Sequence, residues 1–243
     1  MPLRTASINE QHMLPGNAKL YITIVIASGL AVLMLAAKSW PSASFKQFAI
    51  YLGLTALAST LKIKIPGVES TITPNFIFLL LAIYACQFSE VVAISLVSAL
   101  IQSLWRSSKR PRLVQVTFSA AVLVVSTAAA SQISHWLLAG NAWEVSSASV
   151  ILAGCIYFPL NSALVVLVIG LVSGQSFRQI LGNCDTWAFP YFMGGIAFAA
   201  LVATGFNQSS SWKGALILIP VVILAHFYFR NRSGQKLVPH ASA

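Results

Sequence analysis

The sequence predicts an all-helical integral membrane protein, a bundle of about eight transmembrane helices with both termini on the cytoplasmic side. Of its 243 residues, 57% are hydrophobic and only 8% are charged, whereas soluble domains are roughly 45–50% apolar and about 25% charged. The mean hydropathy is +0.80. A helix that crosses the bilayer needs about 20 mostly apolar residues, and the chain contains a series of apolar runs that approach this length.

Eight such runs place the expected spans at residues 20–37, 47–61, 75–88, 90–105, 113–138, 147–173, 188–206 and 214–229. Only residues 87–90 separate the third run from the fourth. A pair of short or tilted helices therefore fits there as well as two full spans. The expected organisation is a tail at 1–19, a helical membrane domain at 20–229 and a basic tail at 230–243, in a multi-pass protein of the bacterial inner membrane.

Basic residues determine the expected orientation. The net charge is +10 and the pI is near 9.9, and cytoplasmic loops of membrane proteins carry an excess of Lys and Arg. With both termini inside, the cytoplasmic segments contain most of the 15 basic residues, namely Arg4, Lys19, Lys62, Lys64, Arg106, Lys109, Arg110, Arg112, Arg178, Arg230, Arg232 and Lys236. The opposite side keeps Lys38, Lys46 and Lys213. The expected partner is therefore the bilayer, and no nucleic acid is expected.

Two of the runs carry further structural signals. The fifth is rich in Ser, Thr and Ala from Thr117 to Ser134, which predicts a helix enclosed by its neighbours near the centre of the bundle. In the sixth, Pro159 and Asn161 within "YFPLNSALV" predict a local break, because Pro removes one backbone hydrogen bond. Broken helices at membrane depth are tolerated where they line a cavity. The tryptophans fall at or near predicted span ends, where they act as interfacial anchors.

The sequence predicts no enzyme. Its few acids map to tails, loops or helix ends, and no H-E-x-x-H or G-x-S-x-G motif is present. Cys86, Cys155 and Cys184 have no metal-binding spacing, so free thiols and neither metal nor cofactor are expected. Ser89 and Glu90 fit an N-cap followed by an acid in the first turn of a helix, with a functional carboxylate as the alternative.

Uncharged amides provide the candidate ligand pocket. An unpaired amide in an apolar environment costs free energy, so these side chains need partners, which are either other helices or a polar ligand. The candidates are Asn75, Gln102, Gln115 and Asn161. Two basic residues, Lys62 and Lys64, are candidate loop contacts that act as a gate or bind an anion. The basic loop "RSSKRPR" either sets the orientation or docks a lipid headgroup or a partner protein. Its basic residues are Arg106, Lys109, Arg110 and Arg112.

The segment "LKIKIPGVESTITPNF" at residues 61–76 is expected to be ordered. Its basic and apolar residues alternate before Pro66, and a period of two is typical of a strand. Pro66 and Gly67 fit the central positions of a type II turn. The segment is therefore expected to form a small hairpin or an extended cap on the mouth of the bundle.

The stretches "ASTLKIKIPGVESTITPNFIFLLLAI" and "SEVVAISLVSALIQSLWRSSKRPRLVQVTFSAA" resemble the N-terminal multi-span membrane region found ahead of HD-GYP phosphodiesterase or GGDEF cyclase modules in bacterial signalling proteins. The resemblance covers about residues 56–125, and its features are Pro66-Gly67, Asn75-Phe76, Glu90, Gln102, Trp105, Arg110-Pro111, Gln115 and Phe118. It implies a stand-alone membrane sensor without catalytic output, which recognises a small or lipophilic signal and passes it to a partner protein.

A looser resemblance points to transport. A helix, a Leu-Lys-Ile-Pro-like loop and a tightly joined helix pair follow one another as in the substrate-binding S components of energy-coupling factor vitamin transporters. In that family the loop covers the ligand from outside, whereas the charge distribution here places residues 62–74 inside. The alternatives to a sensor are thus a solute-binding transporter subunit, or a structural or assembly protein without a ligand.

Overall fold

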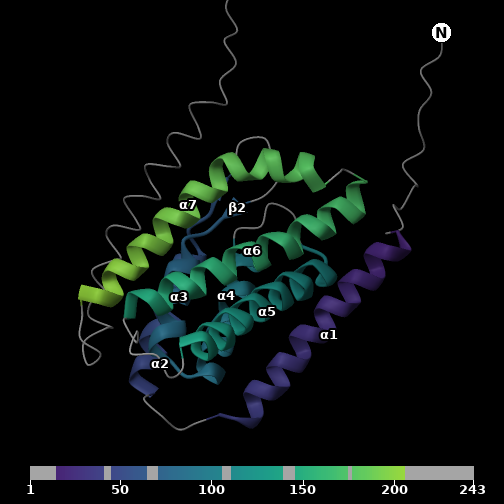
Figure 1. Cartoon of the computed structure of the whole chain (residues 1–243). Coiled ribbons are helices and arrows are strands. Elements are labelled where there is room, and N and C mark those ends of the chain that lie inside the picture. Colours follow the sequence, from purple (N-terminus) through teal and green to yellow (C-terminus); the bar gives the residue numbers. More distant parts are fainter. Residues whose placement is uncertain are drawn as a thin grey trace, which may run out of the picture.

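The computed structural model describes residues 15–40, 45–64, 71–105, 111–138, 146–174 and 177–205, and these are almost entirely helical (Figure 1). The elements are α1 (Gly16–Lys38), α2 (Phe45–Ser59), β1 (Ile63–Lys64), β2 (Thr71–Ile72), α3 (Asn75–Ala85), α4 (Phe88–Leu104), α5 (Leu113–Leu138), α6 (Ser146–Ser173) and α7 (Phe177–Gly205). The predicted helical class is confirmed. The eighth run, at 214–229, lies outside the described residues.

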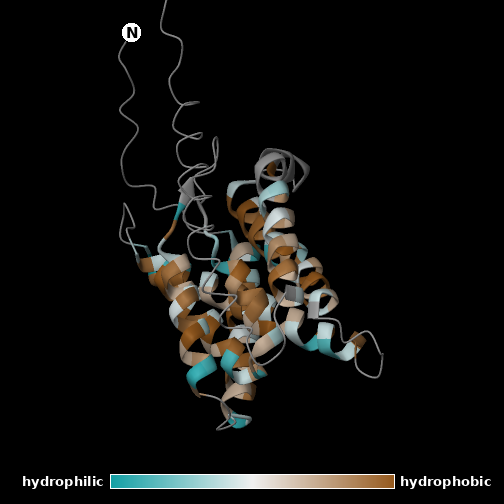
Figure 2. Cartoon of the chain, turned by 90° about the vertical axis from the view of Figure 1, so that its left-hand side faces the viewer, coloured by the Kyte–Doolittle hydropathy of each residue, from teal (hydrophilic) through white to brown (hydrophobic). Residues whose placement is uncertain are grey.

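Three helices are long and apolar enough to cross a bilayer. They are α1, α5 and residues Ser147–Ser173 of α6, which makes the chain a membrane protein as predicted. Shorter apolar helices cover Asn75–Ala85, Phe88–Leu104 and Phe189–Thr204. Hydrophobic residues dominate the helices, and the most hydrophilic ones gather near the helix ends (Figure 2).

The third and fourth runs form a short helix pair, one of the two arrangements that the sequence allowed. α3 has 11 residues and α4 has 17. At a rise of about 1.5 Å per residue, α3 is only about 16 Å long, far less than the roughly 30 Å hydrocarbon core. Nearly all of α3 is buried, because α2, α4, α5, α6 and α7 all pack against it.

α5 is the central long helix, as its Ser, Thr and Ala content predicts. In its most apolar stretch 61% of the residues are buried, against 22% in α1 and 11% in α6. It packs against α1, α4 and α6. Gly29 of α1 approaches it so closely that a Cβ there would lie 2.7 Å from the Ala121 Cβ. Small residues thus bring the two backbones together, as is common where helices pack in lipid.

The expected break in the sixth helix is wrong, and the helix of the seventh run starts earlier than the run itself. α6 runs unbroken from Ser146 to Ser173 with Pro159 inside it. Pro159 and Cys155 are both exposed, so the carbonyl four residues before Pro159 loses its bond on the outer side of the helix while the flanking turns continue. α7 begins at Phe177, well before the expected residue 188, and contains Pro190. Its polar first turns resemble a loop in sequence because they hold residues such as Arg178 and Asp185.

The segment before α3 forms the predicted hairpin. β1 and β2 pair antiparallel, with Ile63 opposite Ile72 and Lys64 opposite Thr71. Pro66 and Gly67 lie outside the described residues, so the type II turn stays a prediction. The end of the bundle that carries this hairpin is called the hairpin end below. It also holds the end of α2, the start of α3, the end of α4 and the start of α5, while the opposite ends of these helices meet at the far end.

Three tryptophans stand at helix ends as predicted, whereas Trp187 lies within α7. Trp40 follows α1 with 53% of its surface exposed, Trp105 follows α4 with 51%, and Trp136 lies in the last turn of α5 with 76%. Trp143 and Trp212 lie outside the described residues. Rings that are this exposed at helix ends fit an anchoring role at the headgroup level.

Candidate functional site: a cavity at the far end

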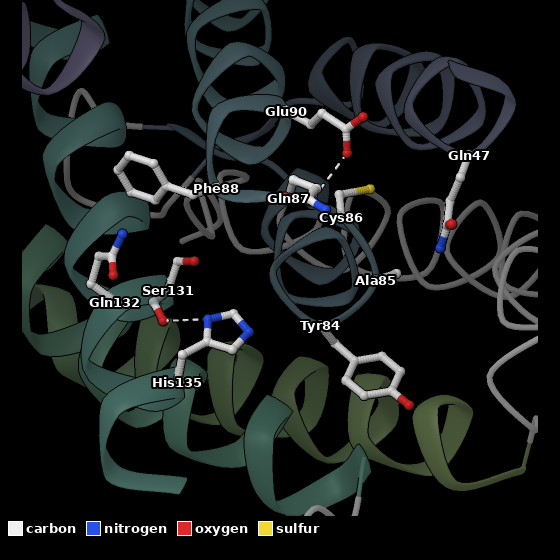
Figure 3. Close-up of a pocket in the computed structure, with 10 residues that line it drawn as sticks. All are labelled: Gln47, Tyr84, Ala85, Cys86, Gln87, Phe88, Glu90, Ser131, Gln132 and His135. Carbon is white, nitrogen blue, oxygen red and sulfur yellow. Dashed lines mark hydrogen bonds between the residues drawn. The ribbon is translucent and has the colours of Figure 1, made fainter. Parts of the chain in front are cut away.

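A cavity of about 480 Å³ opens at the far end of the bundle (Figure 3). Its walls come from the start of α2, the end of α3, the start of α4 and the last turns of α5. Most of its lining side chains carry polar atoms. The lining residues are Gln47, Tyr84, Ala85, Cys86, Gln87, Phe88, Glu90, Ser131, Gln132 and His135.

The cavity exists because a short helix ends beside a long one. α3 stops at Ala85, and the chain turns back within Cys86 and Gln87 to enter α4. α5 continues to Leu138, so Ser131 and His135 rise beside the point at which α3 has ended (Figure 3). The hollow is thus a consequence of the 11-residue length of α3.

Glu90 supplies the negative charge of the cavity wall. It is only 6% exposed, and its Oε2 accepts a hydrogen bond of 2.9 Å from the backbone N–H of Gln87. The N-cap of α4 is Gln87, so the assignment of that position to Ser89 is wrong. Ser89 is buried and donates to the carbonyl of Ser39 at 3.4 Å, which links α4 to the end of α1. The predicted acid in the first turn is confirmed.

His135 has one ring nitrogen bonded and the other toward the cavity. Nδ1 lies 2.7 Å from the carbonyl oxygen of Ser131. A carbonyl only accepts hydrogen bonds, so Nδ1 must carry the proton and the neutral ring then keeps an acceptor at Nε2. Figure 3 shows Nε2 on the side of the ring that faces the cavity. His135 lies in the last turn of α5, close to the end of the expected span 113–138.

Cys86 is the thiol of the cavity wall. It is partly buried and free, as is the exposed Cys155, in agreement with the prediction of free thiols. The side chain of Cys184 lies outside the described residues. Burial, and to a smaller extent the charge of Glu90, raise the pKa of Cys86 to about 12. Cys86 and Glu90 both line the cavity.

Two of the four candidate amides meet at the hairpin end instead. Asn75 Nδ2 donates to Ser98 Oγ at 2.6 Å and lies 3.5 Å from Gln102 Oε1. Its Oδ1 accepts from Thr73 Oγ1 at 2.6 Å, and Ser98 Oγ is 2.7 Å from Ser59 Oγ. We call these five residues the amide cluster. The amide cluster joins α2, α3 and α4. Of the two alternatives that the sequence allowed, other helices or a polar ligand, the partners of Asn75 and Gln102 are therefore other helices.

The other two candidates stand apart from this cluster. Gln115 is exposed, and its Oε1 accepts from the backbone N–H of Arg112 at 3.1 Å, which caps the start of α5. Asn161 lies half-buried in α6. Within the described ranges no hydrogen bond joins either side chain to Asn75 or Gln102. Of the four amides, the described hydrogen bonds bring only Asn75 and Gln102 together.

The basic candidates belong to the hairpin end. Lys62 Nζ donates to the carbonyl of Trp105, which ties the start of the hairpin to the end of α4. Partial burial lowers the pKa of Lys62. Arg112 is exposed at the start of α5. The backbone of Lys64 lies in β1, while its side chain and the residues Arg106, Lys109 and Arg110 lie outside the described part.

Metal chemistry finds no support in the described residues, among which no three His, Cys, Asp or Glu side chains gather as ligands. Comparisons with protein-family models, with curated proteins and with solved structures give no match to this chain. Most residues of the cavity were not recognised in the sequence, because their common feature is a position at the ends of four helices and not a motif.

Proposed function

We propose that this chain is a non-enzymatic, sensor-like protein of the bacterial inner membrane. It binds a small signal molecule in the far-end cavity and transmits occupancy to a partner protein. The observation that carries the proposal is a cavity of about 480 Å³ lined by polar side chains from four helices. Ligand sites typically measure roughly 300–1,000 Å³ and combine a few polar groups with apolar walls.

The distribution of charge favours an outward-facing cavity. Lys19, Lys62 and Arg112 lie toward the hairpin end, whereas Lys38 and Lys46 belong to the far end. Because cytoplasmic segments carry the excess of basic residues, this distribution supports a cytoplasmic hairpin end and a cavity that opens to the outside. A signal from outside then meets the far end, and a partner docks on the basic loop that contains Arg106, Lys109 and Arg110.

Two continuous helices offer a path between these ends. α4 connects Glu90 at the cavity with Gln102 in the amide cluster, and α5 connects its start beside Arg112 with His135 at the cavity. A ligand that draws α4 and α5 together at the cavity shifts their other ends as well, because packed helices move largely as rigid bodies. The resemblance to membrane regions of signalling proteins is consistent with this role.

A transporter subunit remains the second candidate. The order of α2, hairpin and the closely joined α3 and α4 supports the likeness to S components. In those proteins, however, the loop covers the ligand, whereas here β1 and β2 belong to the end of the bundle opposite the cavity. This separation favours a sensor over a solute-binding subunit. The polar lining of the cavity argues against a purely structural protein.

Binding is tested with the purified protein in detergent. The small molecules that co-purify are identified by mass spectrometry, and the melting temperature is followed as they are added back. Ala85→Trp is expected to abolish the ligand-induced stabilisation, because Ala85 lines the cavity and a bulky ring there fills it. Ala49→Trp is the matched control, because Ala49 is exposed on α2 and does not line the cavity. Equal stabilisation of both variants rules out this site.

A further inference from the structure

We propose that the far-end cavity selects a small organic cation, a ligand with an ammonium group that lies against Glu90. This inference rests on the proposed function, because it names the class of ligand for the same site. It follows from the charge of the lining, from the acceptors and rings around it, and from its size.

The charge of the lining is negative. Glu90 is the charged residue among the described lining side chains, which include neither Lys nor Arg. Lys38 and Lys46 belong to the same end of the bundle but do not line the cavity. Ionisable side chains within membrane proteins face a cavity or pair with a partner, and they often mark a ligand site; Glu90 is 6% exposed and lines the cavity. No ion pair to Glu90 is found within the described ranges, so a ligand can supply that partner.

The helix cap uses only part of the carboxylate. Oε2 accepts the single bond from the Gln87 N–H, whereas a carboxylate has two oxygens with about four acceptor positions. Capping also does not require charge, since the carbonyl oxygen of a glutamine accepts the same bond. The remaining acceptor capacity of the carboxylate is left for a ligand at the cavity.

The other walls suit an ammonium group as well. His135 presents the acceptor Nε2, and the amide oxygens of Gln47 and Gln132 are further acceptors for N–H donors. Tyr84 and Phe88 bring aromatic rings to the same space, and the face of an aromatic ring attracts a cation. A carboxylate, neutral acceptors and aromatic rings together discriminate against anions, because the described lining offers neither Lys nor Arg to bind them.

The size of the cavity and the ligand set favour an organic cation over a metal ion. A volume of about 480 Å³ far exceeds the roughly 30 Å³ that one water molecule occupies in the liquid. Divalent metal ions are held by several hard or charged ligands, and the described lining offers one carboxylate. A molecule with a cationic head and a polar remainder matches both features.

The first experiment probes the sign of the charge in the cavity and does not depend on the identity of the natural ligand. Cys155 and Cys184 are replaced by Ala, and the rates at which Cys86 reacts with a cationic trimethylammonium-ethyl and an anionic sulfonato-ethyl methanethiosulfonate are measured. The raised pKa of Cys86 slows its reaction with both reagents. The measured quantity is therefore the ratio of the two rates, divided by the same ratio for N-acetylcysteine in solution. We expect the ratio to favour the cationic reagent by at least about fivefold, because a cleft lined by one sign of charge concentrates the opposite ion.

Glu90→Gln is the matched variant, because the glutamine keeps the shape and the cap while it removes the charge. The preference for the cationic reagent is expected to disappear in this variant. A preference that persists, or a ratio equal to that of N-acetylcysteine in the parent protein, overturns the cationic assignment. Neither result affects the existence of the cavity.

The second experiment measures equilibrium binding. Choline, tetramethylammonium and putrescine are compared with 3,3-dimethylbutan-1-ol, the uncharged counterpart of choline, by the shift in melting temperature. At least one of the cations is expected to stabilise the parent protein, with an affinity about tenfold or more lower in Glu90→Gln, since removing one partner of a buried charge pair weakens binding strongly. Stabilisation only by the neutral alcohol overturns the cationic ligand while the site stands. If no solute stabilises the protein and neither reagent reaches Cys86, the proposed function fails as well.

Discussion

The two ends of the bundle hold similar polar side chains and use them in opposite ways. At the hairpin end, the amide cluster closes on itself, and Asn75 is bonded to Thr73 and Ser98 at 2.6 Å each. At the far end, Gln47, Gln132 and His135 stand around a cavity of about 480 Å³. An amide in an apolar helix is therefore no sign of a ligand site by itself. The length of the neighbouring helices decides whether the amide meets another side chain or an open space.

Replacing one amide at each end gives the largest expected contrast. Asn75→Leu leaves Thr73 and Ser98 without their partner at a buried position, so it is expected to destabilise the protein by about 1–2 kcal/mol. Gln132→Leu makes the same change at an exposed position beside the cavity and is expected to stay within about 0.5 kcal/mol. Unfolding by denaturant in a mild detergent measures both free energies. Equal losses would show that the two ends do not differ in this way.

The cluster is expected to act as a unit. Ser98→Ala removes the contacts of 2.6 Å to Asn75 and 2.7 Å to Ser59, with an expected loss of about 1 kcal/mol. Combined with Asn75→Leu, it should cost less than the sum of the single changes, because both remove the same bond. A double-mutant cycle of unfolding free energies measures this coupling. Strict additivity would contradict a shared hydrogen bond.

The peripheral amides are expected to give the smallest effects. Gln102→Leu removes only a contact of 3.5 Å, at the limit of a hydrogen bond, and Gln115→Ala removes an exposed cap of 3.1 Å at the start of α5. Each is expected to cost about 0.5 kcal/mol or less. Neither should change the rate at which Cys86 reacts, because each removes a contact too weak to shift α4 or α5. A changed rate would show that these contacts help to position the two helices at the cavity.

Periodicity and composition predicted most of the fold. The bounds of α5 coincide with the apolar run 113–138, and the alternation from Leu61 to Ile65 predicted the hairpin. The errors have physical reasons. The helix containing Pro159 continues because its surroundings tolerate one lost hydrogen bond, and the polar first turns of α7 resemble a loop although they are helical.

The cavity was harder to predict than the fold. The sequence identified Glu90 as an acid in the first turn of a helix, with a functional carboxylate as the alternative. His135 falls near the end of the predicted span 113–138, but nothing in the sequence brought the two residues together. They meet because α3 ends early while α5 continues, and this difference in length is visible only when the helices are packed. Asn75 and Gln102 were recognised as amides that need partners, but their partners were other helices.

The shortness of α3 also has a consequence for biosynthesis. A segment of 11 residues cannot hold a transmembrane position in lipid alone, so α3 must enter the bilayer together with α4. The packing around the start of α3 is completed even later, because it needs α7. The Phe76 ring packs against Phe192 with centroids 4.4 Å apart and against Gly195 of α7. Until the ribosome has delivered α7, the aromatic face at Phe76 stays uncovered. A nascent chain stopped before α7 is therefore an expected substrate for membrane quality-control proteases.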